Sequence, residues 1–194
     1  MKIQSASFED IPGILTLLQA NHVDNLSETE KKNGFVTTNM TDQQLAELIR
    51  KESGVAIAKG DDGKILAFAM AGPWEYWSEW PFFAYMIEKL PEFSINSQQL
   101  TTKNSYQYGP ICIDPSVRGT GLFAKVFFAS LASMKERYPF MVTFINQINP
   151  RSYAAHTRKV GMTEVGTFDF NQNHYYLMAC PTGLSQKVKS DLNC

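Results

Sequence analysis

A glycine-rich loop lies where a predicted strand meets a predicted helix. The strand ends at Asp114-Pro115, and Arg118-Gly119-Thr120-Gly121 follows before a helical pattern begins. Glycines at such a junction let backbone N–H groups approach a phosphate, and the helix start adds unpaired N–H groups and the positive end of a dipole. Arg118 would add a charge-assisted contact. A phosphate site and a plain tight turn explain the two glycines equally well.

Three polar residues share one face of the next predicted helix, residues 150–160. Asn149, Ser152 and His156 stand at i, i+3 and i+7. An imidazole with an ordinary pKa near ~6.5 can exchange a proton near neutral pH. Asn149 before Pro150 is also a typical N-cap followed by proline at the first helical position. The pattern therefore fits both a structural cap and a proton-transfer site.

Two other phosphate-binding patterns compete for the glycine loop. Gly119-x-Gly121-x-x-Ala124 fits the dinucleotide fingerprint, which also requires an acidic residue about 20 positions further on. Residues 138–150 contain no acidic residue, and the Gly-Lys-Ser/Thr of a P-loop is missing. A nucleotide-dependent oxidoreductase is therefore the less favoured alternative.

The two motifs together resemble those of the GNAT superfamily of N-acyltransferases. The acyl-CoA loop of that family reads Gln/Arg-x-x-Gly-x-Gly/Ala after a strand ending in x-Pro, and residues 116–121 are similar except that Ser116 stands at the first position. The second motif, Asn-x-x-Ala/Ser-x-x-x-Tyr/His followed by Lys-x-Gly-Phe/Met, is similar to residues 149–162 with one extra residue. Counting from Asn149 puts His156 at the usual Tyr position, and counting back from Gly161 puts Thr157 there.

The resemblance, which covers about residues 105–179, implies an N-acetyltransferase that uses acetyl-CoA as the acyl donor. The acetyl group would pass to an amine by direct attack in a ternary complex, with His156 as proton donor to the leaving thiolate. The alternative is a non-catalytic acyl-CoA-binding sensor domain. The implied cofactor contacts are the backbone of Ile111, Cys112 and Ile113, the loop residues Arg118, Gly119, Thr120, Gly121, Leu122 and Phe123, and the side chains of Asn149 and Ser152. We expect Cys112 to be a buried core residue rather than a nucleophile, because it alternates with two isoleucines. Glu75, Glu79 and Asp114 are candidate bases, although a surface role or an ordered water explains them as well.

Hydrophobic periodicity predicts the elements that position these motifs. The expected strands are residues 2–8, 54–59, 64–71, 105–113, 140–146, 163–170 and 174–179, and the expected helices are 9–20, one from 41, 121–137 and 150–160, with an irregular segment at 22–39. This order predicts an α/β (α+β) fold with a mixed, mostly antiparallel sheet of about seven strands and about four helices. In the resembling family the two central strands splay apart. We expect one domain over residues 1–180 and a polar C-terminal tail over 181–194.

An aromatic insert at about residues 73–104 does not fit a simple sheet connection. It carries all three tryptophans, and Trp74, Tyr76 and Trp77 are candidates for an acceptor-binding wall. A small satellite core or a dimer interface explains these residues equally well.

Composition and charge limit the classes of partner that this protein is expected to bind. The 194 residues include 18 Lys+Arg and 19 Asp+Glu, a net charge of −1. Neither nucleic acid nor an anionic membrane is an expected partner, because both need a basic surface. The three cysteines are widely spaced and there are only three histidines, so we expect no metal site and a location in the reducing cytoplasm. No apolar run reaches the ~20 residues that a membrane span needs. The expected partner is a small-molecule or peptide amine, bound by a monomer or homodimer.

Overall fold

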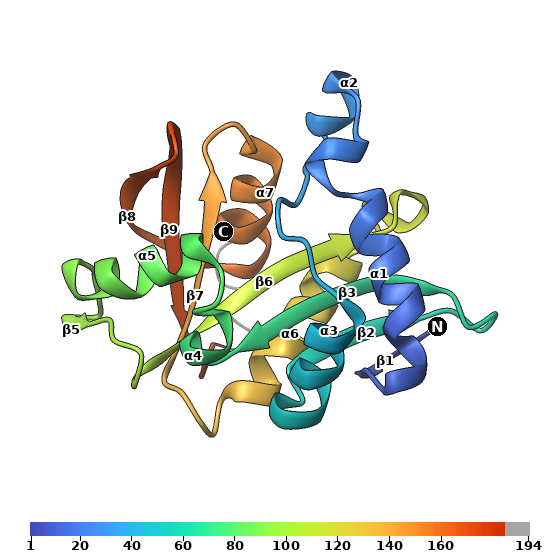
Figure 1. Cartoon of the computed structure of the whole chain (residues 1–194), viewed down its shortest axis with the longest axis horizontal. Coiled ribbons are helices and arrows are strands. Elements are labelled where there is room, and N and C mark those ends of the chain that lie inside the picture. Colours follow the sequence, from blue (N-terminus) through green and yellow to red (C-terminus); the bar gives the residue numbers. More distant parts are fainter. Residues whose placement is uncertain (185–194) are drawn as a thin grey trace, which may run out of the picture.

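The computed structural model describes residues 1–184. A mixed, seven-stranded sheet runs through this part of the chain in the order β1-β2-β3-β6-β7-β9-β8 (Figure 1). Only β6 and β7 run parallel within it. The predicted mostly antiparallel sheet is confirmed, and it differs from the parallel sheet of a dinucleotide-binding fold. The strands are β1 (Lys2–Ser5), β2 (Val55–Lys59), β3 (Ile65–Gly72), β6 (Ser105–Ile113), β7 (Phe140–Asn146), β8 (Thr163–Phe170) and β9 (Asn173–Pro181).

The two central strands diverge, as predicted. β6 and β7 pair only from Ser105 opposite Phe140 to Gln107 opposite Val142. Just beyond, Gly109 adopts a φ of 114° and the pairing of β6 with β3 shifts register. The far half of β6 therefore stays on β3 and moves away from β7.

Helices cover both faces of the sheet. Figure 1 shows α1 (Ile11–Ala20) and α3 (Asp42–Glu47) in front of the sheet and α6 (Leu122–Met134) behind it. Alternate residues of each strand point to opposite faces. Large side chains such as Ile57 and Phe68 therefore pack with α1 and α3, while alanines of the same strands pack with α6. No helix in residues 1–184 has both the length and the apolar character needed to cross a bilayer.

The prediction of about four helices is too low for the described residues, which contain seven α-helices. The additional helices are α2 (Glu28–Lys31), which lies in the segment predicted to be irregular, and α4 (Trp74–Trp77) and α5 (Pro81–Lys89), which lie in the aromatic insert. The helix predicted at 150–160 begins as α7 (Pro150–Ala154). Local caps explain why such short segments become helical. Ser27 and Glu30 form a reciprocal capping box, and Pro81 occupies the first position of α5. A two-stranded sheet of β4 (Ser94–Ile95) and β5 (Gln98–Gln99) completes the aromatic region.

Most of the predicted tail, residues 185–194, lies outside the described residues, and so does Cys194. Its first residues are attached to the fold. Pro181 ends β9, and the Thr182 hydroxyl donates to the Tyr138 carbonyl at 2.7 Å.

Candidate active site

The glycine loop presents unpaired amides at the start of α6. Gly119 and Gly121 adopt φ values of 87° and 81°, in the left-handed region that favours glycine. The amides of Gly119, Thr120 and Gly121 donate to no acceptor in the described part of the chain. The amides of the first helical turn that follows have no acceptor within the helix. The loop therefore offers a contiguous row of N–H donors.

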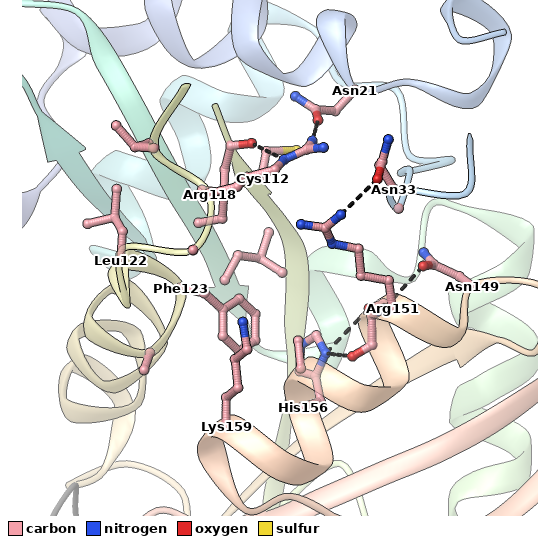
Figure 2. Close-up of a pocket in the computed structure, with 18 of the residues that line it drawn as sticks. Asn21, Asn33, Cys112, Arg118, Leu122, Phe123, Asn149, Arg151, His156 and Lys159 are labelled. Atoms are coloured by element: carbon pink, nitrogen blue, oxygen red, sulfur yellow. Dashed lines mark hydrogen bonds between the residues drawn. The ribbon is translucent and has the colours of Figure 1, made fainter. Parts of the chain in front are cut away.

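A cavity of about 380 Å³ opens at this row of amides (Figure 2). The Thr120 hydroxyl donates to the Val117 carbonyl at 2.7 Å, and Thr120 does not line the cavity. Ser116, which departs from the GNAT pattern, also turns away, because its hydroxyl donates to Asp114 at 2.6 Å. The other predicted cofactor contacts line the cavity together with the predicted proton donor His156; they are Ile111, Cys112, Ile113, Arg118, Gly119, Gly121, Leu122, Phe123, Asn149 and Ser152.

The cavity carries uncompensated positive charge. Arg118, Arg151 and Lys159 line it, and none of the described lining residues is an aspartate or glutamate. Both guanidinium groups are held by neutral amides: Arg118 donates to Asn21 at 2.8 Å, and Arg151 donates to Asn33 at 2.8 Å (Figure 2). Burial and the charge of Arg151 lower the pKa of Arg118. The wall is therefore suited to a polyanion.

The N-terminal side of this cavity could not be predicted from the sequence. Residues 33–38, which we call the strap, pass between α1 and α7 (Figure 1). The strap is tied to α7 by Asn149, whose Nδ2 donates to the Phe35 carbonyl at 3.4 Å. The Asn149 Oδ1 accepts from the Ser152 amide at 3.2 Å, so this side chain is also the predicted helix cap. Polar spacing alone does not reveal such contacts, which join positions more than 100 residues apart.

A π-helical turn accommodates the one extra residue in the second motif. After α7 the helix widens over Ala155–Lys159, and such a turn accommodates one more residue than an α-helix. His156 lines the cavity, whereas the Thr157 hydroxyl donates back to the Tyr153 carbonyl at 2.8 Å. The geometry thus favours His156 over Thr157.

His156 is a neutral imidazole in this environment. It is 3% exposed, and burial lowers its pKa from 6.5 to about 4. Nδ1 lies 2.8 Å from the Ser152 carbonyl, which accepts only from a protonated nitrogen, so the unprotonated nitrogen is Nε2. Nε2 has no hydrogen-bond partner in the described residues. The lowered pKa disfavours the charged imidazole that the predicted proton donor would need, and the neutral ring leaves Nε2 with a lone pair. This state suits a hydrogen-bond acceptor.

A second cavity of about 100 Å³ lies where β6 and β7 diverge. The two cavities share six lining residues and meet there: Phe35, Val36, Ile111, Asn149, Ser152 and His156. The first cavity would take a long polyanionic ligand and the second a small one. His156 lies at their junction.

The predicted acceptor wall lies elsewhere. Trp74 and Trp77 have no exposed surface, and Trp74 Nε1 donates to the Ser105 hydroxyl at 3.1 Å. The Tyr76 hydroxyl donates to the Gln44 carbonyl at 2.8 Å. None of the three lines either cavity, because the rings close a core over the sheet. Phe83, from the same aromatic region, does line the second cavity.

The candidate bases lie outside both cavities, whereas Cys112 is the buried residue that its alternation with two isoleucines predicts. Glu75, Glu79 and Asp114 line neither cavity. The hydrogen-bonded ion pair with Lys64 at 2.7 Å, with help from Ser116, lowers the pKa of Asp114 to about 2. Burial raises the pKa of the Cys112 thiol, which therefore stays protonated and is a poor nucleophile.

No protein-family model matches the sequence, and no curated protein matches it. Solved structures do match. An N-acetyltransferase from Staphylococcus aureus Mu50 is 17% identical with a TM-score of 0.61, over 93% of this chain and 98% of that chain. The ribosomal-protein-S18-alanine N-acetyltransferase from Escherichia coli is 14% identical with a TM-score of 0.59, over 95% of each chain. A GNAT superfamily phosphinothricin acetyltransferase from Sinorhizobium meliloti, in complex with AcCoA, is 14% identical with a TM-score of 0.60, over 93% of this chain and 87% of that chain. At these identities the likeness establishes the fold: the chain has the fold of GNAT acetyltransferases.

Proposed function

We propose that this protein is an N-acetyltransferase that transfers an acetyl group from acetyl-CoA to an amine. One observation carries the proposal: the row of free amides from Gly119 to Gly121 opens on a cavity with three basic side chains and no described carboxylate. A diphosphate satisfies such amides and charges together. The GNAT fold and the AcCoA-bound structural relative support the same ligand.

In this proposal the larger cavity holds the donor. The diphosphate binds the amides of residues 119–123, with Arg118, Arg151 and Lys159 supplying positive charge. The pantetheine arm lies along Ile111, Cys112 and Ile113 and reaches the junction of the two cavities. The thioester is then next to the smaller cavity, from which the amine approaches.

The reaction forms one C–N bond and breaks one C–S bond. The amine nitrogen attacks the thioester carbon, the sulfur leaves with the bond's electron pair, and one proton moves from nitrogen to sulfur. His156 Nε2 accepts a hydrogen bond from the amine N–H, which aims the nitrogen lone pair at the carbon. The amine must enter uncharged, and transfer into the smaller cavity lowers its pKa through desolvation. These reaction steps therefore need no charged side chain of the protein to remove a proton from the amine.

A transfer assay tests the proposal against a non-catalytic acyl-CoA sensor. The protein is incubated with acetyl-CoA and a mixture of primary amines, and released thiol and N-acetylated products are quantified. The proposal predicts stoichiometric thiol and amide. Acetyl-CoA binding without any product over a broad amine mixture would establish the sensor instead.

A further inference from the structure

The smaller cavity has a chemistry that selects its occupant. Its wall includes Phe35, Phe83, Phe144 and Tyr175, and none of the described lining residues is acidic. Phe83 is 3% exposed and packs on Phe144 at 5.4 Å between ring centroids. Phe144 in turn meets Tyr175 at 6.2 Å in an edge-to-face arrangement. Interlocked rings of this kind give a rigid apolar surface.

Uncharged polar side chains complete the lining of this cavity, among them Thr143, Asn146 and Gln107. Gln107 is the last β6 residue paired with β7, and it is 2% exposed. Its Nε2 donates to the Tyr108 carbonyl at 2.8 Å, which fixes the orientation of the amide. Its Oε1 has no partner in the described residues. A Cβ at Gly109 would make only ordinary contacts, at 3.5 Å, with Gln107 Nε2 and Thr143 Oγ1, so the φ of 114° and not the space explains the glycine.

On the basis of the proposed function, we infer that the acceptor is a primary amine with a compact, uncharged apolar body. The aromatic wall receives the body, and Gln107 Oε1 accepts a hydrogen bond from an N–H of the occupant. The volume of about 100 Å³ is below the ~150 Å³ of an enclosed cavity known to hold benzene, but this cavity joins the larger one and does not close around its occupant. The body is therefore a branched alkyl chain or one small ring.

The same features disfavour charged acceptors. A polyamine or a lysine derivative would bring a second ammonium group into a cavity without a described carboxylate to pair with it. Burying an unpaired charge is costly. Discrimination against such acceptors therefore comes from the missing partner as well as from shape.

Competition among amines tests this inference. With saturating acetyl-CoA at pH 8.5, we expect kcat/KM for isoamylamine and benzylamine to exceed that for spermidine, lysine amide and an alanine-initiated peptide by about tenfold or more. Higher kcat/KM for any of the charged or peptide acceptors overturns the inference and leaves the proposed function standing. Transfer to none of these amines also overturns it. Absence of acetyl-CoA binding overturns the proposed function itself.

Two substitutions test whether the selectivity among amines arises in the smaller cavity. Gln107→Leu should lower kcat/KM for benzylamine about tenfold while leaving the Kd of acetyl-CoA unchanged. Phe83→Leu should raise kcat/KM for 1-naphthylmethylamine relative to benzylamine about fivefold, since the smaller side chain enlarges the cavity beside the apolar wall. Phe8→Ala, at an exposed ring outside both cavities, is the matched control and should change neither value. Unchanged amine selectivity in both cavity variants, with acetyl-CoA binding intact, would refute the assignment.

Discussion

His156 should make the folded protein less stable in mild acid. Its imidazole is 3% exposed, and Nδ1–H donates to the Ser152 carbonyl while Nε2 lacks a partner in the described residues. Protonation would place a charge inside the protein without a carboxylate beside it, because no described residue lining the two cavities is acidic. Burial accordingly lowers the pKa of His156 from 6.5 to about 4.

The magnitude follows from the difference between the two pKa values. Above pH 6.5 the imidazole is neutral in both the folded and the unfolded state, so it adds no pH dependence. As the pH falls from 6.5 to about 4, the unfolded state binds a proton that the folded state does not. Stability is therefore lost through this window by about 1.4 kcal/mol per pH unit, or about 3 kcal/mol in all.

Urea unfolding of the wild type and of His156→Gln at pH 7.5 and pH 4.5 measures this loss. The free energy of unfolding should fall more in the wild type than in the variant, by about 2–3 kcal/mol. Carboxylates titrate in both proteins and cancel in the comparison. His174→Gln, which removes an exposed imidazole on β9, controls for the substitution itself. An identical fall in the wild type and in His156→Gln would refute the reasoning that burial keeps this imidazole neutral.

Three further predictions concern the donor site and the reaction. Arg151→Gln should weaken acetyl-CoA binding about tenfold in calorimetry and reduce the salt dependence of Kd, because one charge-assisted contact is lost; an unchanged Kd would remove Arg151 from the donor site. Gly121→Ala should lower Tm by about 2–4 °C, since alanine costs ~1 kcal/mol at a φ of 81°, and should also weaken acetyl-CoA binding. Gly63→Ala, at a φ of 84° in the β2–β3 turn, should lower Tm similarly with no effect on binding, and equal binding by both variants would argue against the amide row. Because His156 stays neutral, kcat/KM should rise with pH as the amine loses its proton and show no inflection near 6.5; a clear inflection there would indicate a titrating imidazole in the reaction.

Local signals made the sheet and the donor loop predictable. Short apolar runs predicted β2, β3 and β7 to within one residue, because each strand is buried by a layer on each face. The glycines at 119 and 121 marked a left-handed turn that other residues adopt only with strain. The Asn149-Pro150 pair likewise marked the start of α7.

Non-local contacts explain what could not be predicted. Asn21 and Asn33 look like ordinary loop residues until the fold brings them to Arg118 and Arg151. Aromatic composition likewise does not distinguish a core from a binding wall, so Trp74 was as reasonable an acceptor contact as any neighbouring ring. The electrostatic state of a histidine depends on burial, which spacing along one helix does not give.

Calorimetric titration of the purified protein with acetyl-CoA, with NADH as the comparison ligand, tests the central claim most directly. The free amides and the three basic side chains predict acetyl-CoA binding with a Kd of about 1–10 μM that weakens with added salt. NADH also carries a diphosphate but has no pantetheine arm to lie along Ile111 and Ile113, so it should bind at least about tenfold more weakly. Absence of acetyl-CoA binding, or equal binding of NADH, would contradict the assignment of this cavity to an acyl-CoA donor.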